Sequence, residues 1–423
     1  MNGKETLLSV RHDSGRSQML RIVMISPLPP EPAGESPYTA KLITGLAGRE
    51  DIQISAICGL GAECIDLEDG SIECLPLWNR RDPLYPLRLL RLVGSRRPHL
   101  VHVQFGPDRR MYGGLFGEPM LFLLILLRLC GLSTTVTLHS TWLPEQVKEK
   151  VRWYKGLGRL SLLAPALFGF YMRLLDLGTD SLQLSSATID STLRRRFLHE
   201  WHYRKDKVLE IPLPCELPER SLGREQALAH LGLVGKKVIL VFGFIRRAKG
   251  LELALAAMNK LRTSVPDSLL LIAGTPVDKD GAQYRRELKE AASRFSVSEH
   301  IRFDTRFILE EEMHLYISAA SVLLLPYVES VGASGPAHRL AGYGVPIVAS
   351  DVGYHMRECL GGRLILFKAG DSEDLADRLE QVLCDSSFAK ITGQSLRQYA
   401  ETETWGAAVE RTLANYYSTL KLR

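Results

Sequence analysis

Short apolar runs rich in β-branched residues recur along the chain and alternate with longer segments of mixed polarity. The runs fall at 21–25, 100–103, 135–138, 237–243, 268–273, 322–325 and 345–349. Helical patterns follow several of them, for example over 38–46 and 251–261. Buried parallel strands are apolar on both faces, so such runs alternating with helices predict parallel βαβ units. The alternation of strands and helices begins again near residue 237. The pattern therefore predicts an α/β fold of two doubly wound, Rossmann-like domains facing a central cleft.

Length and charge pattern set the predicted domain limits. A single core rarely grows beyond about 250–300 residues, and this chain has 423. Residues 1–18 are polar and mixed in charge, so we expect a flexible tail and no signal peptide there. The first domain is predicted over 19–205, the second over 206–402, and a last segment over 403–423. The basic run 194–207 precedes a Pro-rich stretch and is predicted to be a solvated hinge.

Composition indicates an ordinary globular protein and gives no sign of nucleic-acid binding. Hydrophobic residues make up 45% and charged residues 24%, as in an ordinary globular protein. The net charge of +5 is too dispersed to indicate nucleic-acid binding, although it suits phosphorylated ligands. The 7 cysteines form no C-x-x-C pair, which is typical of reduced thiols in the cytoplasm.

Three segments raise the question of membrane contact. The apolar stretches 119–127 and 160–172 are shorter than the roughly 20 residues that a spanning helix needs, so both are predicted to be buried helices. Residues 87–97 mix leucines with arginines in a basic amphipathic pattern. That pattern fits a surface helix packed on the sheet, and it also fits peripheral contact with an anionic membrane.

The candidate site residues are those that follow the strands, since open parallel sheets bind ligands at the carboxyl ends of their strands. The first such loop, 26–34, is Pro-rich and ends at Gly34, where a missing side chain permits close backbone approach to a ligand. His139 directly follows the strand 135–138. Its imidazole is expected to donate a hydrogen bond to a sugar or phosphate oxygen.

Two loops of the second half predict an anion site. Arg246, Arg247 and Lys249 lie between a strand and the next helix, where cations and free helix amides suit a diphosphate. The Gly-rich segment 329–346 places Ser334 as the N-cap of a short helix, followed by Gly335 and a proline. Its amides would bind an anion without a metal. No metal-binding or Walker motif competes with this interpretation, so we expect neither a metal nor a cofactor.

Together these elements resemble the family 4 retaining glycosyltransferases of the GT-B fold, from about residue 20 to the C-terminus. The resemblance implies that the loop ending at Gly34, with Tyr38, faces the acceptor and the donor phosphate. It implies that His139 contacts the donor sugar and that Lys249 holds the diphosphate. The loop around Phe307 would read the nucleotide base. The helix opened by Trp405 would cross back from the nucleotide-sugar domain to the acceptor domain.

Two positions depart from the family pattern. Phe244 stands where the family usually has an arginine, and Arg246 or Arg247 is expected to supply that charge. The family also has two glutamates separated by seven residues, and here one is missing. Glu329 is expected to reach the donor sugar or the ribose, while Ser334, Gly335 and His338 keep the anion site.

The resulting interpretation is a glycosyltransferase of polysaccharide-biosynthesis type, with retention of anomeric configuration. The donor would be a nucleotide-diphosphate sugar and the acceptor a glycan, a lipid-linked molecule or a small molecule. A cytoplasmic location is expected, with the inner face of the membrane as a further option. Two alternatives remain: a nucleotide-sugar epimerase of the same fold, which needs carboxylates near the anomeric carbon, and a catalytically silent GT-B binding subunit, which the missing glutamate favours.

Overall fold

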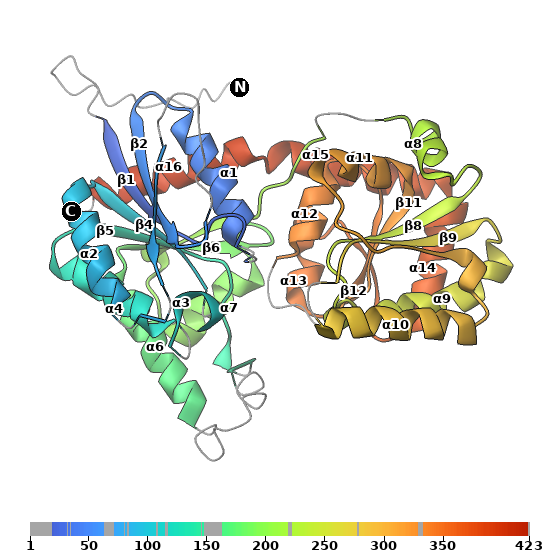
Figure 1. Ribbon diagram of the computed structural model, residues 1–423, viewed down its shortest axis with the longest axis horizontal. Coiled ribbons are helices and arrows are strands. Elements are labelled where there is room, and N and C mark those ends of the chain that lie inside the picture. The colour runs from blue at the N-terminus through green and yellow to red at the C-terminus, as the bar shows by residue number, and fades with distance from the viewer. Residues whose placement is uncertain are drawn as a thin grey trace, which may run out of the picture.

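The computed structural model describes most of the chain. The described residues are 19–31, 33, 35–62, 72–79, 81–82, 84–106, 109–114, 117–144, 146–147, 163–218, 222–276, 279–328 and 333–421. The predicted tail over 1–18 therefore lies outside them. Two lobes, each a parallel sheet covered by helices, make up this part of the protein (Figure 1).

The first sheet has seven parallel strands in the order β3-β2-β1-β4-β5-β6-β7. The strands are β1 Leu20–Ile25, β2 Ile52–Gly59, β3 Ile72–Trp78, β4 Leu100–Phe105, β5 Ser133–Leu138, β6 Ser181–Ser186 and β7 Val208–Pro212. The helices with them are α1 Glu35–Ala47, α2 Tyr85–Arg96, α3 Arg109–Tyr112, α4 Glu118–Leu129, α6 Ala164–Gly178 and α7 Thr192–Trp201. A proline occurs in β3, which is possible because β3 is an edge strand.

The second sheet has six parallel strands in the order β10-β9-β8-β11-β12-β13. They are β8 Lys237–Phe242, β9 Ser268–Ala273, β10 Ile301–Asp304, β11 Ala320–Leu325, β12 Ile347–Asp351 and β13 Ile365–Lys368. The helices are α8 Arg224–Leu231, α9 Leu251–Ser264, α10 Lys279–Arg294, α11 Glu310–Ala319, α12 Gly335–Ala341, α13 Tyr354–Arg357, α14 Ser372–Cys384 and α15 Ser386–Thr402. The predicted class, two doubly wound α/β domains, is confirmed.

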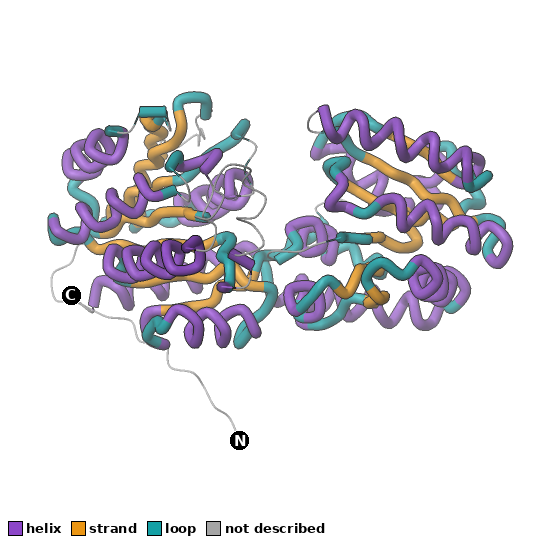
Figure 2. The backbone as a smooth tube through the Cα atoms, turned by 90° about the horizontal axis from the view of Figure 1, so that it is seen from below, coloured by secondary structure: helices purple, strands orange, loops and turns teal. Residues whose placement is uncertain are grey.

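The last helix, α16 Trp405–Lys421, returns to the first domain (Figures 1 and 2). Val409, Leu413 and Tyr416 are buried there in one cluster with residues of β1, β2 and α1. The approach of α16 to α1 is close, since a Cβ built at Gly45 would lie 2.7 Å from Cγ2 of Val409. The first domain is thus assembled from two distant segments of the chain.

The predicted hinge over 194–207 is wrong. Residues 194–201 belong to α7, and Lys205–Lys207 form a short 3-10 turn before β7. Leu193, Phe197 and Trp201 are buried along one face of α7, so the basic residues are its solvent side. The chain instead crosses to the second domain just after β7, where the amide of Cys215 donates to the carbonyl of Glu403 at 2.7 Å.

The basic amphipathic segment 87–97 lies in α2, and the predicted buried helix 160–172 overlaps α6. The two helices differ in how much of their apolar surface is buried. In α2, Leu89 and Val93 are fully buried in the core of the first domain, whereas Leu87 is exposed. In α6, Phe168 is buried but Leu167 and Phe170 are exposed, so that helix is only half buried. No helix among the described parts of the chain is both long and apolar enough to cross a bilayer.

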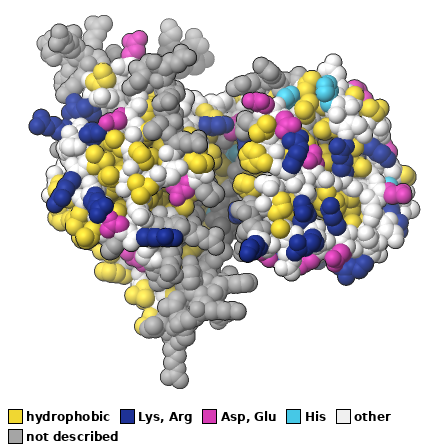
Figure 3. Space-filling view, viewed as in Figure 1, with side chains coloured by type: hydrophobic (Ala, Val, Ile, Leu, Met, Phe, Trp, Pro, Cys, Tyr) yellow, Lys and Arg dark blue, Asp and Glu magenta, His cyan; other side chains and the backbone are white. Residues whose placement is uncertain are grey.

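Ion pairs and hydrogen bonds join the two domains on one side. Glu216, in the link after β7, pairs with Lys41 of α1 at 2.5 Å and with Arg339 of α12 at 3.3 Å. The carboxylate of Glu358, after α13, accepts from the amide of Thr192 at 2.9 Å, at the start of α7. Beyond these contacts a notch separates the lobes in the space-filling view (Figure 3).

Candidate functional site

The loops after the strands of both sheets lie toward the notch between the domains. All strands in a sheet run in one direction, so these loops gather at one edge. Figure 1 shows α12 and α13, which follow β11 and β12, on the side of the second domain next to the first. Helix α13 contacts α7 across the boundary. Ligands of open α/β sheets bind at this edge.

Lys249 is held in place by its backbone neighbours. It ends a 3-10 turn, Arg247–Lys249, after β8. Gly250 follows with φ +60°, and a Cβ there would lie 2.2 Å from the carbonyl oxygen of Pro326. The amide of Val328 donates to the carbonyl of Ala248 at 3.1 Å, so the loops after β8 and β11 are joined. A larger residue at 250 would force these loops apart.

The ammonium of Lys249 lies against Tyr327. Its Nζ donates to the Tyr327 hydroxyl at 2.9 Å and lies 4.0 Å from the centre of that ring. The Tyr327 hydroxyl is in turn 3.2 Å from Oγ of Ser334. Burial, and secondly the positive charge of Arg246, lower the pKa of Lys249 to about 8. No carboxylate pairs with Lys249 among the residues that the structure describes, so this cation is desolvated and has capacity for an anion.

The two arginines of the same loop differ in their surroundings. Arg247 pairs with Asp280 at 3.1 Å and with Glu287 at 2.8 Å, which turns its guanidinium toward α10. Arg246 is exposed and lies over the ring of Phe244, at 5.5 Å from the centroid. Because Arg246 is also close enough to lower the pKa of Lys249, it remains a candidate to supply the charge that the family arginine would bring. Arg247 does not.

The predicted N-cap forms at α12. Oγ of Ser334 accepts from the amide of Ala337 at 3.4 Å, and Gly335 is the first residue of the helix. His338 is fully buried, and its Nδ1 donates to the carbonyl of Ser334 at 2.9 Å. Burial lowers the pKa of His338 to about 4. A neutral, enclosed imidazole cannot serve as a cation for the diphosphate, so His338 shapes the loop that carries Ser334.

The region of the missing glutamate is only partly described. Glu329 lies outside the described residues, as does Gly34 in the first loop. Arg339, one of the positions at which the second glutamate could fall, pairs with Glu216 at the link between the domains. The side chain at this position therefore takes part in the contacts that join the domains.

His139 lies at the end of β5 with Tyr38 beside it. The rings are 4.7 Å apart and nearly perpendicular, and Trp405 lies 5.2 Å from Tyr38 on the other side. Nε2 of His139 is 2.7 Å from Oε1 of Gln104. Burial of the imidazole lowers the pKa of His139 to about 3, so the ring is neutral at pH 7.

The partner of Nε2 determines the tautomer of His139. An amide oxygen only accepts, so with this side-chain assignment Nε2 carries the proton and Nδ1 does not. The remaining nitrogen can accept a hydrogen bond from a sugar hydroxyl. This tautomer differs from the expectation that the imidazole donates to a sugar or phosphate oxygen, and that expectation stays a prediction.

A buried polar chain continues behind His139. Nε2 of Gln104 is 3.2 Å from Nε2 of His102, and Nδ1 of His102 is 2.5 Å from the hydroxyl of Tyr416 on α16. The hydroxyl of Thr137 lies 2.8 Å from Nε2 of His102. The crossing helix therefore reaches the site through hydrogen bonds, a connection that strand and helix patterns alone do not reveal.

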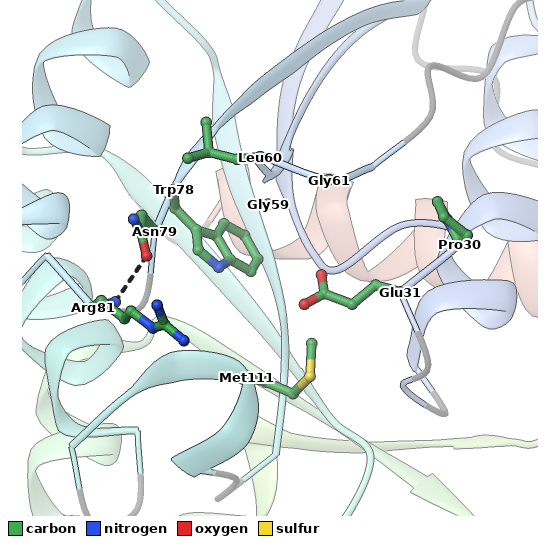
Figure 4. Close-up of a pocket in the computed structure, with 9 residues that line it drawn as sticks. All are labelled: Pro30, Glu31, Gly59, Leu60, Gly61, Trp78, Asn79, Arg81 and Met111. Carbon is green, nitrogen blue, oxygen red and sulfur yellow. Dashed lines mark hydrogen bonds between the residues drawn. The ribbon is translucent and has the colours of Figure 1, made fainter. Parts of the chain in front are cut away.

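A cavity of about 430 Å³ opens at the same edge of the first sheet (Figure 4). Its walls come from the carboxyl ends of four neighbouring strands. Glu31 follows β1, Gly59 ends β2, Trp78 ends β3, and Met111 lies on α3, which follows β4. A Cβ at Gly59 would lie 3.1 Å from Oε2 of Glu31 and 3.9 Å from Nε1 of Trp78. The missing side chain keeps the space between them open.

The remaining candidate, Phe307, lies on the loop after β10 and is 66% exposed, as a residue that stacks on a base could be. The structure thus gathers Lys249, Arg246 and Ser334 in the second domain, and His139 and Tyr38 in the first. Sequence reasoning missed Tyr327 and Gln104. Both had a signal, since Tyr327 follows the Pro326 that ends a strand, and Gln104 and His102 are the two polar residues of an otherwise apolar strand.

Comparison with known proteins finds a family match in the second domain. Residues 236–385 match the family model described as glycosyl transferases group 1. This match lies within the second domain. It covers the loops that carry Lys249, Tyr327 and Ser334, and it agrees with the resemblance drawn from the motifs.

Two curated relatives are similar to parts of the chain. One is the GDP-mannose-dependent alpha-(1-6)-phosphatidylinositol monomannoside mannosyltransferase of Mycolicibacterium smegmatis, 28% identical over 42% of this chain and 46% of the relative. The other is the D-inositol 3-phosphate glycosyltransferase of Corynebacterium aurimucosum, 26% identical over 46% of each. The chain thus matches about half the length of these relatives, and both are named as glycosyltransferases.

Solved structures share the whole architecture. Sucrose-phosphate synthase from Thermosynechococcus elongatus has a TM-score of 0.70 at 18% identity. The aligned region covers 96% of this chain and 100% of the synthase chain. Anabaena HepE, solved in complex with UDP, has a TM-score of 0.69 at 13% identity, over 95% and 100%. The glycosyltransferase WaaG has a TM-score of 0.63 at 14% identity, over 92% and 98%. The predicted GT-B fold is confirmed.

Proposed function

We propose that this protein is a glycosyltransferase that moves a sugar from a nucleoside-diphosphate sugar to a hydroxyl group of an acceptor. The observation that carries the proposal is the partly buried ammonium of Lys249 beside Tyr327 and Ser334, which has no carboxylate partner among the residues that the structure describes. A cation with a lowered pKa gains most from an anion that is equally removed from water. The family match of the same loops and the UDP held by a structural relative support a nucleotide donor.

The proposed reaction breaks the bond between the anomeric carbon and the diphosphate oxygen. The acceptor oxygen forms the new bond to that carbon, and its proton passes to the departing diphosphate. Lys249 and Arg246 stabilise the negative charge that develops on the leaving group, and His139 accepts a hydrogen bond from the donor sugar. Preorganised charges of this kind are a large source of rate enhancement. We propose attack on the same face as the leaving group, with retention, and no metal or cofactor.

The acceptor would enter from the first domain, as a glycan, a lipid-linked molecule or a small molecule. The epimerase alternative needs carboxylates near the anomeric carbon to exchange protons, and neither curated relative is named as an epimerase. A silent binding subunit would keep the anion site without turnover. The missing glutamate is the feature that favours it.

One experiment separates these three functions. The full-length protein is incubated with a panel of radiolabelled UDP- and GDP-sugars, and products are separated by chromatography. A transferase is expected to release free sugar slowly from one donor, because water replaces the absent acceptor. An epimerase would give a new nucleotide-sugar. Neither product from any donor, together with measurable binding of UDP or GDP, would indicate the silent subunit and contradict the proposal.

A further inference from the structure

A stripe of buried polar side chains runs along one face of β4. Successive side chains of a strand point to opposite faces, so Leu100, His102 and Gln104 share a face. Leu100 lies in one hydrophobic cluster with Leu413 and Tyr416 of α16, which therefore covers this face. The residues of the opposite face are apolar and lie in a second cluster: Val101, Val103 and Phe105. Buried polar groups destabilise a core unless they have hydrogen-bond partners, so His102 and Gln104 require partners inside the domain.

Hydrogen bonds join these groups into one chain that runs from α16 to the candidate site. The hydroxyl of Tyr416 lies 2.5 Å from Nδ1 of His102, and Nε2 of His102 lies 3.2 Å from Nε2 of Gln104. Oε1 of Gln104 lies 2.7 Å from Nε2 of His139. Burial lowers the pKa of His102 to about 3 and raises the pKa of Tyr416, so both side chains are uncharged at pH 7. The first three members are fully buried and His139 is partly exposed, so the chain begins in the core and ends at the site.

Each hydrogen bond of this chain fixes the proton of the next group. With the Gln104 oxygen toward His139, the amide nitrogen faces His102, and such a nitrogen only donates. Nε2 of His102 therefore accepts, the proton of the ring lies on Nδ1, and Nδ1 donates to the oxygen of Tyr416. Thr137 offers the opposite arrangement, because its oxygen lies 2.8 Å from Nε2 and could accept from a proton there. The Tyr416 oxygen is the partner that keeps the proton on Nδ1.

Ring packing around His139 fixes the place of the imidazole but not which of its nitrogens carries the proton. The ring of Tyr38 lies 4.7 Å away, and Trp405, the first residue of α16, lies 5.2 Å from Tyr38. These ring contacts are available to both neutral tautomers. The tautomer is set by the hydrogen bond that a ring nitrogen makes, here the bond between Nε2 and Gln104. Whatever orients the amide of Gln104 therefore selects the tautomer of His139.

We propose that Tyr416 is a positioning residue, which through His102 and Gln104 selects the tautomer that His139 presents to the donor sugar. The inference rests on the proposed transferase function for the donor sugar, whereas the tautomer itself is a property of the protein alone. Without the Tyr416 hydroxyl, the N–H at Nδ1 of His102 has no acceptor in the chain, and the proton moves to Nε2, where Thr137 accepts. The amide of Gln104 then turns its oxygen toward His102, and the proton of His139 shifts from Nε2 to Nδ1.

The test compares Tyr416→Phe with Tyr203→Phe in the full chain. Tyr203 is the matched control because it is also buried in the first domain, and its hydroxyl donates to the carbonyl of Met172 at 2.7 Å, outside the polar chain. Both variants lose one buried hydroxyl, so their melting temperatures should fall by similar amounts. The first readout is a long-range ¹H–¹⁵N spectrum of histidine-labelled protein without substrate, in which ring nitrogens with and without a proton resonate far apart. A His139→Ala protein identifies the signals of His139 among those of the 11 histidines.

The proton of His139 is expected on Nε2 in the wild type and in Tyr203→Phe. In Tyr416→Phe it is expected on Nδ1 or divided between the two nitrogens. The second readout is the release of sugar from the donor that the wild type turns over. Tyr416→Phe should lower turnover about 5- to 10-fold relative to Tyr203→Phe, the equivalent of one buried hydrogen bond, with unchanged affinity for UDP or GDP. A His139→Ala protein should lose no further turnover when Tyr416→Phe is added.

A wild-type proton on Nδ1 of His139, or unchanged His139 signals in Tyr416→Phe, overturns the proposal. So does a loss of turnover no larger than that of Tyr203→Phe, or a loss that persists in full on the His139→Ala background, because Tyr416 would then act elsewhere. If Tyr416→Phe fails to fold, His102→Phe interrupts the chain nearer to His139 and is judged by the same criteria. A wild type that turns over no donor contradicts the transferase proposal alone, since the spectra still decide whether Tyr416 sets the tautomer.

Discussion

Replacing Lys249 by methionine separates a structural role from a functional one. Methionine keeps the length of the side chain and removes its charge. The pKa of Lys249 falls from 10.5 to about 8 in the empty protein, which corresponds to about 3 kcal/mol spent on desolvating the ammonium. Lys249→Met removes that cost, while Tyr327 keeps its contact with Ser334 at 3.2 Å. The melting temperature is therefore expected to stay the same or to rise.

Turnover is expected to move in the opposite direction. An ammonium that stabilises the leaving diphosphate is worth about a hundredfold or more in rate, or about 2.7 kcal/mol. The assay is the release of radiolabelled sugar from the active donor, with thermal unfolding recorded on the same samples.

The matched control is Lys260→Met. That lysine lies on the exposed side of α9 and pairs with Asp377 at 2.6 Å, a surface pair whose loss costs at most about 1 kcal/mol. Turnover of this control should equal that of the wild type. A Lys249→Met protein with turnover within about threefold of the wild type would refute the assignment of this lysine.

The remaining predictions concern charge and hydrogen bonding around the same site. The ammonium of Lys249 is present below its pKa of about 8 and lost above it, so the affinity for UDP or GDP should fall as pH rises through 8 to 9, and Lys249→Arg should remove this dependence in a calorimetric pH series. His139→Ala should lower turnover by about tenfold or more while leaving diphosphate affinity nearly unchanged, because the ring contacts the sugar; an equal loss in both would contradict its role. Gln104→Glu should place a carboxylate 2.7 Å from Nε2 of His139 and raise the pKa of His139, so a new acid-side inflection should appear in the pH–rate profile. An unchanged profile together with normal turnover would show that Gln104 does not position the ring.

The strands that carry candidate residues could be predicted because they are apolar on both faces. The run 268–273 coincides with β9, and the run 237–243 ends one residue beyond β8. Strand β6 was harder to predict, since four of the six residues of Ser181–Ser186 are polar and yet all six are buried. Two of these polar groups have partners on distant segments: Oγ of Ser181 donates to Oδ1 of Asn415 on α16 at 2.7 Å, and Oε1 of Gln183 accepts from the hydroxyl of Thr137 on β5 at 2.8 Å. Hydropathy alone gives no warning of such a pairing between distant segments.

In the candidate site too, the sequence predicts where a residue lies but not which distant residue it contacts. The position of Lys249 follows from its place after a strand, and His139 likewise. Their partners do not, because Tyr327 and Gln104 are brought close by sheet order and not by spacing in the chain. The wrong hinge has a simpler cause. Leu193, Phe197 and Trp201 recur every four residues, which is a helical period, but the three consecutive arginines between them hid it.

The return of α16 to the first domain also constrains how the protein is made. On the ribosome the strands of the first domain emerge early, but the helix that covers Leu20, Ile22 and Tyr38 appears only after the whole second domain. Until then that apolar face and the polar groups of β4 to β6 stay accessible to water. In topological terms the second domain is an insertion within the first. The domain that begins the chain is completed only after the other, and an isolated N-terminal fragment would lack a wall of its own core.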